Sequence, residues 1–426
     1  MNVRKIAYRV LRKLEKDNRF PSGEVRDALS RMERRERAFF KELVWGVMRR
    51  QVYLDWLLDT YLKNPEIPPG IRVVLRMGAY QILFMDSVPT YAAVSESVKL
   101  VENRSFRGLV NAILRRIAED GLKEPPEIHL RYSHPRWIYE ELLKWGDIAE
   151  KVMEDHLKPL PTTLRVNALR TTREELKKRI EDMGIETFET PHSPLGLVVK
   201  YNGDFTTFFA VKEGLATVQG EPSQLVTPIL DPKPGSAVLD MAAGLGGKTT
   251  HIAEHMKDEG RVVAVDPSIE KIERLLFHRD RLGLKSIETA VMDGRNAPDV
   301  FKEEFDYVLL DAPCTSLGTA RKNPDVLLTT KPSDPERLQK LQIELLEAAS
   351  KVLRKGGKLL YSTCTFTKVE NTGVSERGEE FGLRPVDIRE KLQVFGVDYV
   401  WDGRSALLLP DGNVLTEFYI SLMEKV

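Results

Sequence analysis

Residues 236–249, SAVLDMAAGLGGKT, join a short apolar run to a glycine-rich turn. A helical pattern, KTTHIAEHM, continues from the turn, and apolar runs then alternate with helical patterns as far as residue 364. This βαβα order predicts a doubly wound, mostly parallel sheet. Because such sheets bind ligands at the carboxyl ends of their strands, we expect the functional site at that edge.

The glycine turn favours a nucleoside cofactor. Its glycines are Gly244, Gly246 and Gly247, and they allow a ligand to approach the backbone where a Cβ would clash. Asp266 ends the next predicted strand, where a carboxylate can accept both ribose hydroxyls. Nicotinamide dinucleotides and S-adenosylmethionine both fit this arrangement. The full G-x-G-x-x-G signature fails because Thr249 replaces its third glycine, and a Walker loop fails because Ala242 replaces its first.

The chain has only two cysteines, Cys314 and Cys364. Two cysteines cannot form a disulfide scaffold or a four-cysteine metal site, and we predict no metal. Each follows a predicted strand, so both are expected near the cofactor edge. A thiol must have a lowered pKa to attack at neutral pH, and Lys248, Arg321 and Lys322 are candidate cations for that purpose.

The overall charge of the chain, 64 basic against 64 acidic residues, hides an uneven distribution. Residues 1–125 contain 24 Lys/Arg and 16 Asp/Glu and show helical apolar spacing, with prolines between the helical runs. A basic helical domain fits a polyanionic partner, although solvated helix faces would give the same pattern. Residues 126–215 read as a linker and a small α+β module, including a capping box at Thr172 and Glu175.

Membrane and targeting signals are absent from the sequence. The amino-terminal residues carry a charge every few positions, and the chain has no run of about 18 apolar residues. We therefore expect a cytoplasmic protein that does not enter a membrane.

Two motifs around the cysteines resemble signatures of the Fmu/Sun family of RNA cytosine-C5 methyltransferases. They are Asp311-Ala-Pro-Cys314, with Asn323-Pro-Asp325 beyond it, and Tyr361-Ser-Thr-Cys364, with Glu370-Asn371 beyond it. Residues 240–249 resemble the cofactor turn of the family. Residues 76–83 and 88–94 are similar to its NusB-like RNA-binding domain, which marks the branch acting on small-subunit ribosomal RNA.

The resemblance implies a multidomain fold. It consists of an all-α NusB-like domain over residues 1–125, a linker and small RRM-like α+β module over 126–215, and a Rossmann-like α/β methyltransferase domain over 216–426. It also implies S-adenosylmethionine as cofactor, RNA as partner, with 16S-type rRNA favoured, and a monomer.

The resemblance also implies roles for individual residues. Cys364 would be the nucleophile that adds to C6 of cytosine, Cys314 would assist release of the product, and Asp311 would hydrogen-bond the edge of the base. Asp266 would bind the ribose and Asp293 the adenine. The implied cofactor-binding residues are Ala242, Ala243, Gly244, Leu245, Gly246, Gly247, Lys248, Asp266, Asp293 and Asp311.

The cofactor turn departs from the family pattern Cys-Ala-Ala-Pro-Gly-Gly-Lys, since this chain has Ala242-Ala-Gly-Leu-Gly-Gly-Lys248. Loss of the proline and gain of Gly244 predict a looser turn. Three other functions are alternatives: methylation of tRNA cytosine, a non-catalytic RNA-binding or ribosome-assembly role, and a nicotinamide-dependent oxidoreductase.

Overall fold

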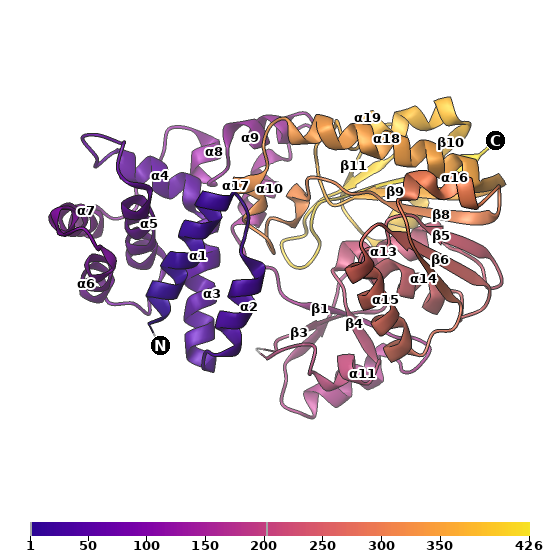
Figure 1. Cartoon of the computed structure of the whole chain (residues 1–426), viewed down its shortest axis with the longest axis horizontal. Helices are drawn as coiled ribbons and strands as arrows, with labels where there is room; N and C mark the ends of the chain where they lie inside the picture. Colours follow the sequence, from indigo (N-terminus) through magenta and orange to yellow (C-terminus); the bar gives the residue numbers. More distant parts are fainter. Residues whose placement is uncertain (1, 202) are drawn as a thin grey trace. The chain divides into compact units, whose positions relative to one another are not determined.

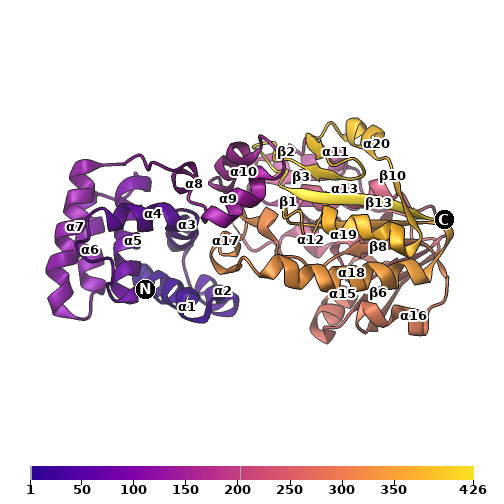
Figure 2. The same cartoon turned by 90° about the horizontal axis from the view of Figure 1, so that it is seen from above.

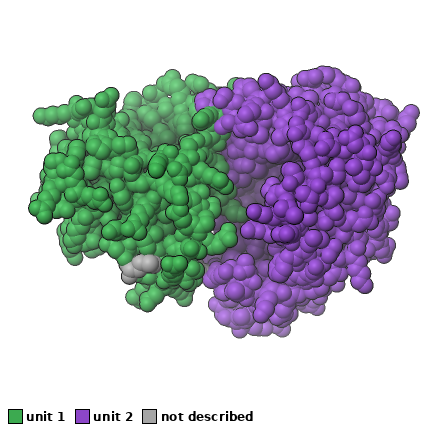
Figure 3. Space-filling view, viewed as in Figure 1, with its two compact units in different colours: residues 1–158, 320–331 green, residues 159–319, 332–426 purple. Residues whose placement is uncertain are grey.

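The computed structural model describes residues 2–201 and 203–426. The chain forms two compact units, one of residues 1–158 with 320–331 and the other of residues 159–319 with 332–426 (Figure 3). The first unit therefore includes a segment that lies far along the chain. The three-domain division with boundaries after residues 125 and 215 stays a prediction.

The described part of the first unit is helical, as its sequence predicts. The helix α1 (Val3–Asp17) shows why: the Asn2 side chain caps it by accepting the Lys5 N–H, and Ala7, Val10 and Leu11 lie buried on one face. Helices α5 and α7 pack against each other and against α6 (Figures 1 and 2). The remaining elements of the amino-terminal stretch are α2 (Ser22–Ser30), α3 (Arg34–Arg49), α4 (Gln51–Asp59), α5 (Pro69–Phe84), α6 (Thr90–Leu100), η1 (Arg104–Phe106), α7 (Arg107–Asp120), α8 (Ile128–Arg131), α9 (Arg136–Leu143) and α10 (Ala149–His156).

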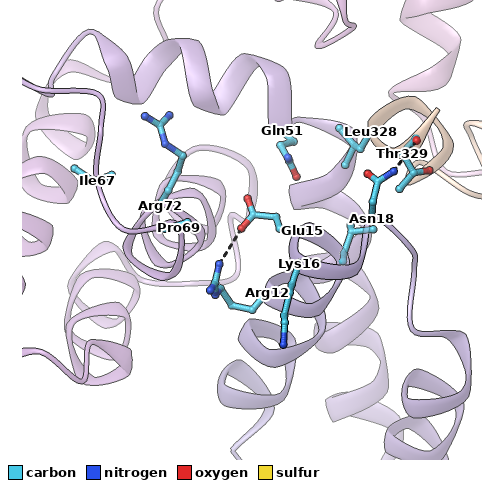
Figure 4. A pocket seen from close by; sticks show the side chains of 11 residues that line it. Arg12, Glu15, Lys16, Asn18, Gln51, Ile67, Pro69, Arg72, Leu328 and Thr329 are labelled. Atoms are coloured by element: carbon cyan, nitrogen blue, oxygen red, sulfur yellow. Dashed lines mark hydrogen bonds and ion pairs between the residues drawn. The ribbon is translucent and has the colours of Figure 1, made fainter. Parts of the chain in front are cut away.

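The inserted segment 320–331, which contains α17 (Val326–Thr329), is held in this unit by polar contacts. The Arg321 guanidinium lies 3.1 Å from the Asp155 carboxylate, and both side chains are almost fully buried. Trp45 donates its indole N–H to the Lys322 carbonyl. The segment also lines a cavity of about 600 Å³, to which Leu328 and Thr329 contribute together with residues of α1 and α5 (Figure 4). Its cationic lining residues are Arg12, Lys16 and Arg72.

The second unit begins with a small antiparallel sheet of order β2-β3-β1-β4. Thr172 and Glu175 form the predicted capping box of its helix, α11. Leu164, Leu176 and Leu197 are fully buried between the sheet and this helix. The elements are β1 (Thr163–Val166), α11 (Arg173–Glu181), β2 (Thr187–Glu189), β3 (Gly196–Val199), α12 (Phe209–Lys212) and β4 (Ala216–Val218).

The larger sheet of this unit has the order β11-β12-β13-β9-β8-β5-β6-β7, with β10 paired to β13. Its core, β9-β8-β5-β6-β7, is parallel, as the βαβα pattern predicts (Figure 1). Helix α18 contacts β8 and β9, while α14 and α15 contact β6. The strands are β5 (Ala237–Asp240), β6 (Arg261–Asp266), β7 (Ile287–Val291), β8 (Phe305–Asp311), β9 (Leu353–Thr363), β10 (Leu383–Val386), β11 (Tyr399–Trp401), β12 (Ala406–Leu408) and β13 (Phe418–Lys425).

The sheet is more antiparallel than the sequence pattern predicts, because β13 returns against β9 and carries β10 and β12 beside it. Short loops join β11 to β12 and β12 to β13, since antiparallel neighbours need no long crossover. In the described residues, no helix is long and apolar enough to cross a membrane.

The helices that accompany the larger sheet are α13 (Glu221–Leu230), α14 (Gly247–His255), α15 (Ile269–Leu282), η2 (Gly294–Asn296), α16 (Ala297–Val300), η3 (Leu317–Thr319), α18 (Asp334–Val352), α19 (Thr372–Ser375), η4 (Glu376–Phe381) and α20 (Arg389–Phe395).

Candidate active site

The glycine turn connects the end of β5, at Asp240, to the start of α14, at Gly247. Gly246 has φ +82°, and a Cβ there would lie 2.5 Å from Cγ of Leu275, so this position requires glycine. A cavity of about 220 Å³ opens beside the turn. It is lined by Gln219, Ser223, Asp240, Ala242, Ala243, Gly244, Leu245, Gly247, Lys248 and Asp311.

Asp266 and Asp293 follow neighbouring parallel strands, as the sequence analysis expects, but neither lines this cavity. Asp266 is buried and accepts hydrogen bonds from the backbone N–H groups of Gly244, at 3.1 Å, and Ser268, at 2.9 Å. Asp293 is bound by the Arg295 side chain, and this hydrogen bond lowers the pKa of the carboxyl group. The Asp266 carboxylate therefore helps to hold the glycine turn in place.

Lys248 and Asp311 link the glycine turn to the first cysteine motif. Lys248 Nζ lies 2.5 Å from Asp311 Oδ2, and the Ser362 hydroxyl donates to Asp311 Oδ1 at 2.8 Å. Burial acts to lower the pKa of Lys248, but the negative charge and hydrogen bond of Asp311 outweigh it, so the pKa is raised. Lys248 is therefore a cation at neutral pH, and its charge also stabilises the Cys364 thiolate.

The two thiols face each other at the carboxyl ends of β8 and β9, with their sulfur atoms 3.4 Å apart. Both cysteines are free. The hydrogen bond between them lowers the pKa of Cys364 and raises the pKa of Cys314 well above its usual value. These directions favour Cys364 over Cys314 as the thiol that loses its proton and acts as a nucleophile.

Buried polar residues that the sequence analysis did not single out individually hold the loop after Cys314. The Glu370 carboxylate accepts the backbone N–H of Thr315 at 2.8 Å and its hydroxyl at 2.6 Å. The Gln342 side chain donates to the same carboxylate and to the Pro313 carbonyl. In the sequence, Glu370 stood out only as part of the second cysteine motif. Its contact with Thr315, 55 residues earlier in the chain, explains why a carboxylate occurs in that motif.

The loop after Cys364 is held in a similar way. Asn371 accepts a hydrogen bond from the Thr363 hydroxyl and donates one to the Thr365 carbonyl, on either side of Cys364. The backbone N–H of Gly318 donates to the Cys364 carbonyl at 3.0 Å. A Cβ at Gly318 would lie 2.5 Å from the Glu417 carbonyl oxygen, so only glycine permits this approach.

Of the other proposed thiol-activating cations, Arg321 is bound to Asp155 within the first unit. This buried ion pair with Asp155 helps to hold the 320–331 segment in the first unit. Lys248 is the candidate cation that the structure places beside the thiols. The suggestion that Arg321 lowers the pKa of a thiol stays a prediction.

Arg165, in β1, is a residue of the site region that sequence reasoning missed. Its fully buried guanidinium pairs with Glu254 of α14 at 3.0 Å and donates to the Gly247 carbonyl at 2.8 Å. It also donates to the side chains of Gln219 and Thr250. The small sheet therefore fixes the first turn of the helix that begins at the glycine turn.

Replacing Arg165 with methionine should destabilise the protein by about 3–5 kcal/mol, because it leaves the Glu254 carboxylate buried without its cation. Denaturant unfolding followed by circular dichroism measures the effect. Arg261→Met is the matched control, since Arg261 makes two ion pairs but is 37% exposed and should change stability by less than about 1 kcal/mol. Equal losses in both variants would contradict this assignment.

A parallel core with a glycine turn after its first strand and carboxylates after the next two is typical of domains that bind a nucleoside cofactor, S-adenosylmethionine-dependent methyltransferases among them. Family models match three stretches of the chain: NusB family over residues 1–119, the RsmF/B-like ferredoxin-like domain over 134–206, and 16S rRNA methyltransferase RsmB/F over 227–423. The chain belongs to this RsmB/F methyltransferase family, which confirms the resemblance to the Fmu/Sun enzymes.

Curated relatives and solved structures agree with this membership. The chain is 34% identical to the probable ribosomal RNA small subunit methyltransferase B of Bacillus subtilis, covering 100% of this chain and 99% of that protein. It is 30% identical to ribosomal RNA small subunit methyltransferase B of Klebsiella pneumoniae, covering 87% and 88%. The crystal structure of PH0851 matches with a TM-score of 0.81 at 28% identity, covering 100% and 99%. NSun6 from Pyrococcus horikoshii, solved with SFG, shares the fold, with a TM-score of 0.59 at 23% identity, covering 68% of this chain and 98% of that one.

Proposed function

We propose that this protein methylates C5 of a cytosine in small-subunit ribosomal RNA, with Cys364 as nucleophile. The observation that carries the proposal is the thiol pair, 3.4 Å apart, beside the Lys248–Asp311 ion pair. The names of the relatives support the substrate class. The proposal includes a monomeric cytoplasmic enzyme that uses no metal in the methyl-transfer step.

The residues of the glycine turn fit S-adenosylmethionine. The backbone approaches the cavity at Gly244 and Gly247, where no side chain obstructs it, and Asp266 lies next to Gly244. Residues 242–248 would hold the cofactor, Asp266 its ribose and Asp293 its adenine. When bound, the cofactor supplies the electrophilic methyl group.

The residues of this chain would activate the cytosine and release the methylated product. Cytosine C5 is a poor nucleophile until the Cys364 thiolate adds to C6 and makes C5 enamine-like. Asp311, held by Lys248 and Ser362, would hydrogen-bond the base edge and favour a proton at N3. Loss of the C5 proton and β-elimination then break the bond from sulfur to C6. Cys314, hydrogen-bonded to the attacking sulfur, would assist this release.

The target base must leave its stack to meet a half-buried thiol, which favours a loop or single strand as substrate. The excess of Lys and Arg in residues 1–125 would supply contacts to phosphates. The cavity of the first unit adds Arg12, Lys16 and Arg72 as candidates for such contacts (Figure 4). Arg72 is already paired with Asp55 and Asp59, and Arg12 with Glu15, so Lys16 is the stronger candidate.

Bisulfite sequencing of total RNA, ribosomal and transfer RNA included, from cells with and without the gene tests the proposal. We expect one or more small-subunit cytosines to be methylated only when the gene is present. Reintroducing the gene with Cys364→Ala should not restore the mark. A mark confined to transfer RNA would instead support the tRNA alternative, and an unchanged map in all RNA would contradict methyl transfer.

Asp266→Ala should weaken the binding of S-adenosylmethionine by about 10- to 100-fold, because a charged acceptor for the ribose and for the Gly244 N–H is lost. Isothermal titration calorimetry measures the dissociation constant directly. Asp306→Ala is the matched control. Asp306 lies near the start of the core strand β8, whereas Asp266 lies at the end of β6, and Asp306 pairs with Arg354. Unchanged affinity in Asp266→Ala would contradict its place in the cofactor site.

A further inference from the structure

Three potential metal ligands from separate segments of the second unit converge away from the thiols. His192 lies between β2 and β3, Glu221 begins α13, and Asp411 lies between β12 and β13. One ligand atom from each lies within 4.8 Å of the other two. Glu221 is fully buried, and the side chains of His192 and Asp411 are only 11% and 15% exposed. None of the three has a role in the proposed methyl transfer.

Backbone N–H groups bind one oxygen of each carboxylate. The other oxygen of each carboxylate remains available at the point where the three side chains converge. Glu221 Oε1 accepts the backbone N–H groups of His192 and Ser193, both at 2.8 Å. Asp411 Oδ1 accepts those of Asn413, at 2.8 Å, and Leu415, at 2.9 Å. Such outer hydrogen bonds are the usual way in which proteins fix the direction of metal ligands.

The histidine is oriented in the same way. Its Nδ1 lies 3.0 Å from the Phe395 carbonyl oxygen. A carbonyl can only accept, so Nδ1 carries a proton, and in the neutral ring Nε2 then has a lone pair. Asp411 and Glu221 raise the pKa of His192, so a metal ion would compete with a proton at Nε2. Hydrogen bonding of one ring nitrogen to a carbonyl leaves the other as a metal ligand.

The remaining atoms, His192 Nε2, Glu221 Oε2 and Asp411 Oδ2, are buried and have no hydrogen-bond partner within the described residues. Nε2 and Asp411 Oδ2 are 3.6 Å apart, which is too long for a hydrogen bond. Two buried carboxylate oxygens facing Nε2 are unfavourable unless a proton on Nε2 or a metal cation lies between them.

We propose that His192, Glu221 and Asp411 form a binding site for a divalent transition-metal ion, with Zn²⁺ the favoured occupant. One imidazole and two carboxylates are a ligand set that zinc binds, whereas Mg²⁺ and Ca²⁺ prefer oxygen ligands alone. Tetrahedral zinc bonds of about 2.0–2.2 Å place two ligand atoms roughly 3.3–3.6 Å apart, so atoms up to 4.8 Å apart would have to approach by up to about 1.5 Å. A fourth position would remain for water.

The proposed ion would join the β2–β3 loop of the small sheet to α13 and to the loop before β13 in the larger sheet. That loop leads to Phe418, whose ring lies 5.4 Å from Lys248 Nζ. The ion would therefore stabilise the segment that enters the active site, without taking part in the chemistry. This departs from the sequence-based expectation of no metal, which considered cysteine ligands.

Zinc binding to the full-length protein tests the proposal. The protein is stripped with a chelator, dialysed, and titrated with Zn²⁺ alone, and bound metal is measured by mass spectrometry together with the melting temperature. We expect one equivalent of Zn²⁺ with micromolar or tighter affinity and a rise in melting temperature. Mg²⁺ at the same concentrations should give neither.

His192→Gln and Asp411→Asn should each weaken this binding at least about 100-fold. Asp411→Asn retains a side-chain oxygen for the backbone N–H groups, so it keeps the test valid if His192→Gln does not fold. His255→Gln is the matched control, because His255 faces Asp231 in a partly exposed pair and should leave zinc binding unchanged. Absence of stoichiometric zinc in the wild type would overturn the proposal. Zinc held equally by His192→Gln or Asp411→Asn would also overturn it, since it would place the ion on other groups, such as the thiols.

Discussion

Replacing Cys364 with alanine is expected to reduce methyl transfer to RNA by roughly 10³-fold or more, because it removes the thiol assigned to activate C5 by adding to C6. We assign the attack to Cys364 because the hydrogen bond from Cys314 lowers its pKa, and the Lys248 charge acts in the same direction. Tritium transfer from labelled S-adenosylmethionine to ribosomal RNA measures the loss.

Calorimetry provides the control for this variant. Cys364 is not among the residues that line the cofactor cavity, so Cys364→Ala should bind S-adenosylmethionine with unchanged affinity. Loss of transfer with binding retained would assign the defect to the chemical step. Methyl transfer at the wild-type rate would exclude Cys364 as the nucleophile.

Cys314→Ala is expected to give the opposite phenotype: the protein forms the covalent bond to RNA but does not release it. Cys364 loses the hydrogen bond from Cys314 in this variant, but Ser316 and Lys248 still lower its pKa, so it can still add to the base. The thiol that lies 3.4 Å away to assist elimination is missing. Covalent protein–RNA adduct should therefore accumulate and appear as a shifted band on a denaturing gel. Turnover should fall by about 10²-fold or more.

The double variant Cys314→Ala/Cys364→Ala is the matched control for the adduct. It should give no shifted band, because the attacking sulfur is absent. A band of equal strength in the double variant would mean that another residue is crosslinked. Absence of a band in Cys314→Ala under turnover conditions would remove the release role assigned to Cys314.

Local sequence patterns were sufficient to predict the parallel core and the residues at its edge. The carboxyl ends of adjacent parallel strands meet, so residues after β5, β8 and β9, such as Lys248, Asp311 and Cys364, were expected to lie together. Positive φ at Gly246 likewise follows from its place in the turn. These features depend on periodicity and spacing, which a single sequence displays.

The features that the sequence did not reveal depend on partners far along the chain. Arg165 reads as an ordinary charged residue until Glu254 is brought beside it. Arg321 looked like a cation near Cys314 because its contact with Asp155 spans 166 residues. His192, Glu221 and Asp411 come from three loops, and no spacing pattern connects them. Tertiary contacts of this kind leave no local periodicity to detect.

The most direct test of the central claim is mass spectrometry of the nucleotide-linked peptide from the Cys314→Ala adduct formed with small-subunit ribosomal RNA and S-adenosylmethionine. We expect a methylated cytidine attached to the peptide that contains Cys364. A cytidine attached to any other residue, or an adduct that lacks cytidine, would contradict it.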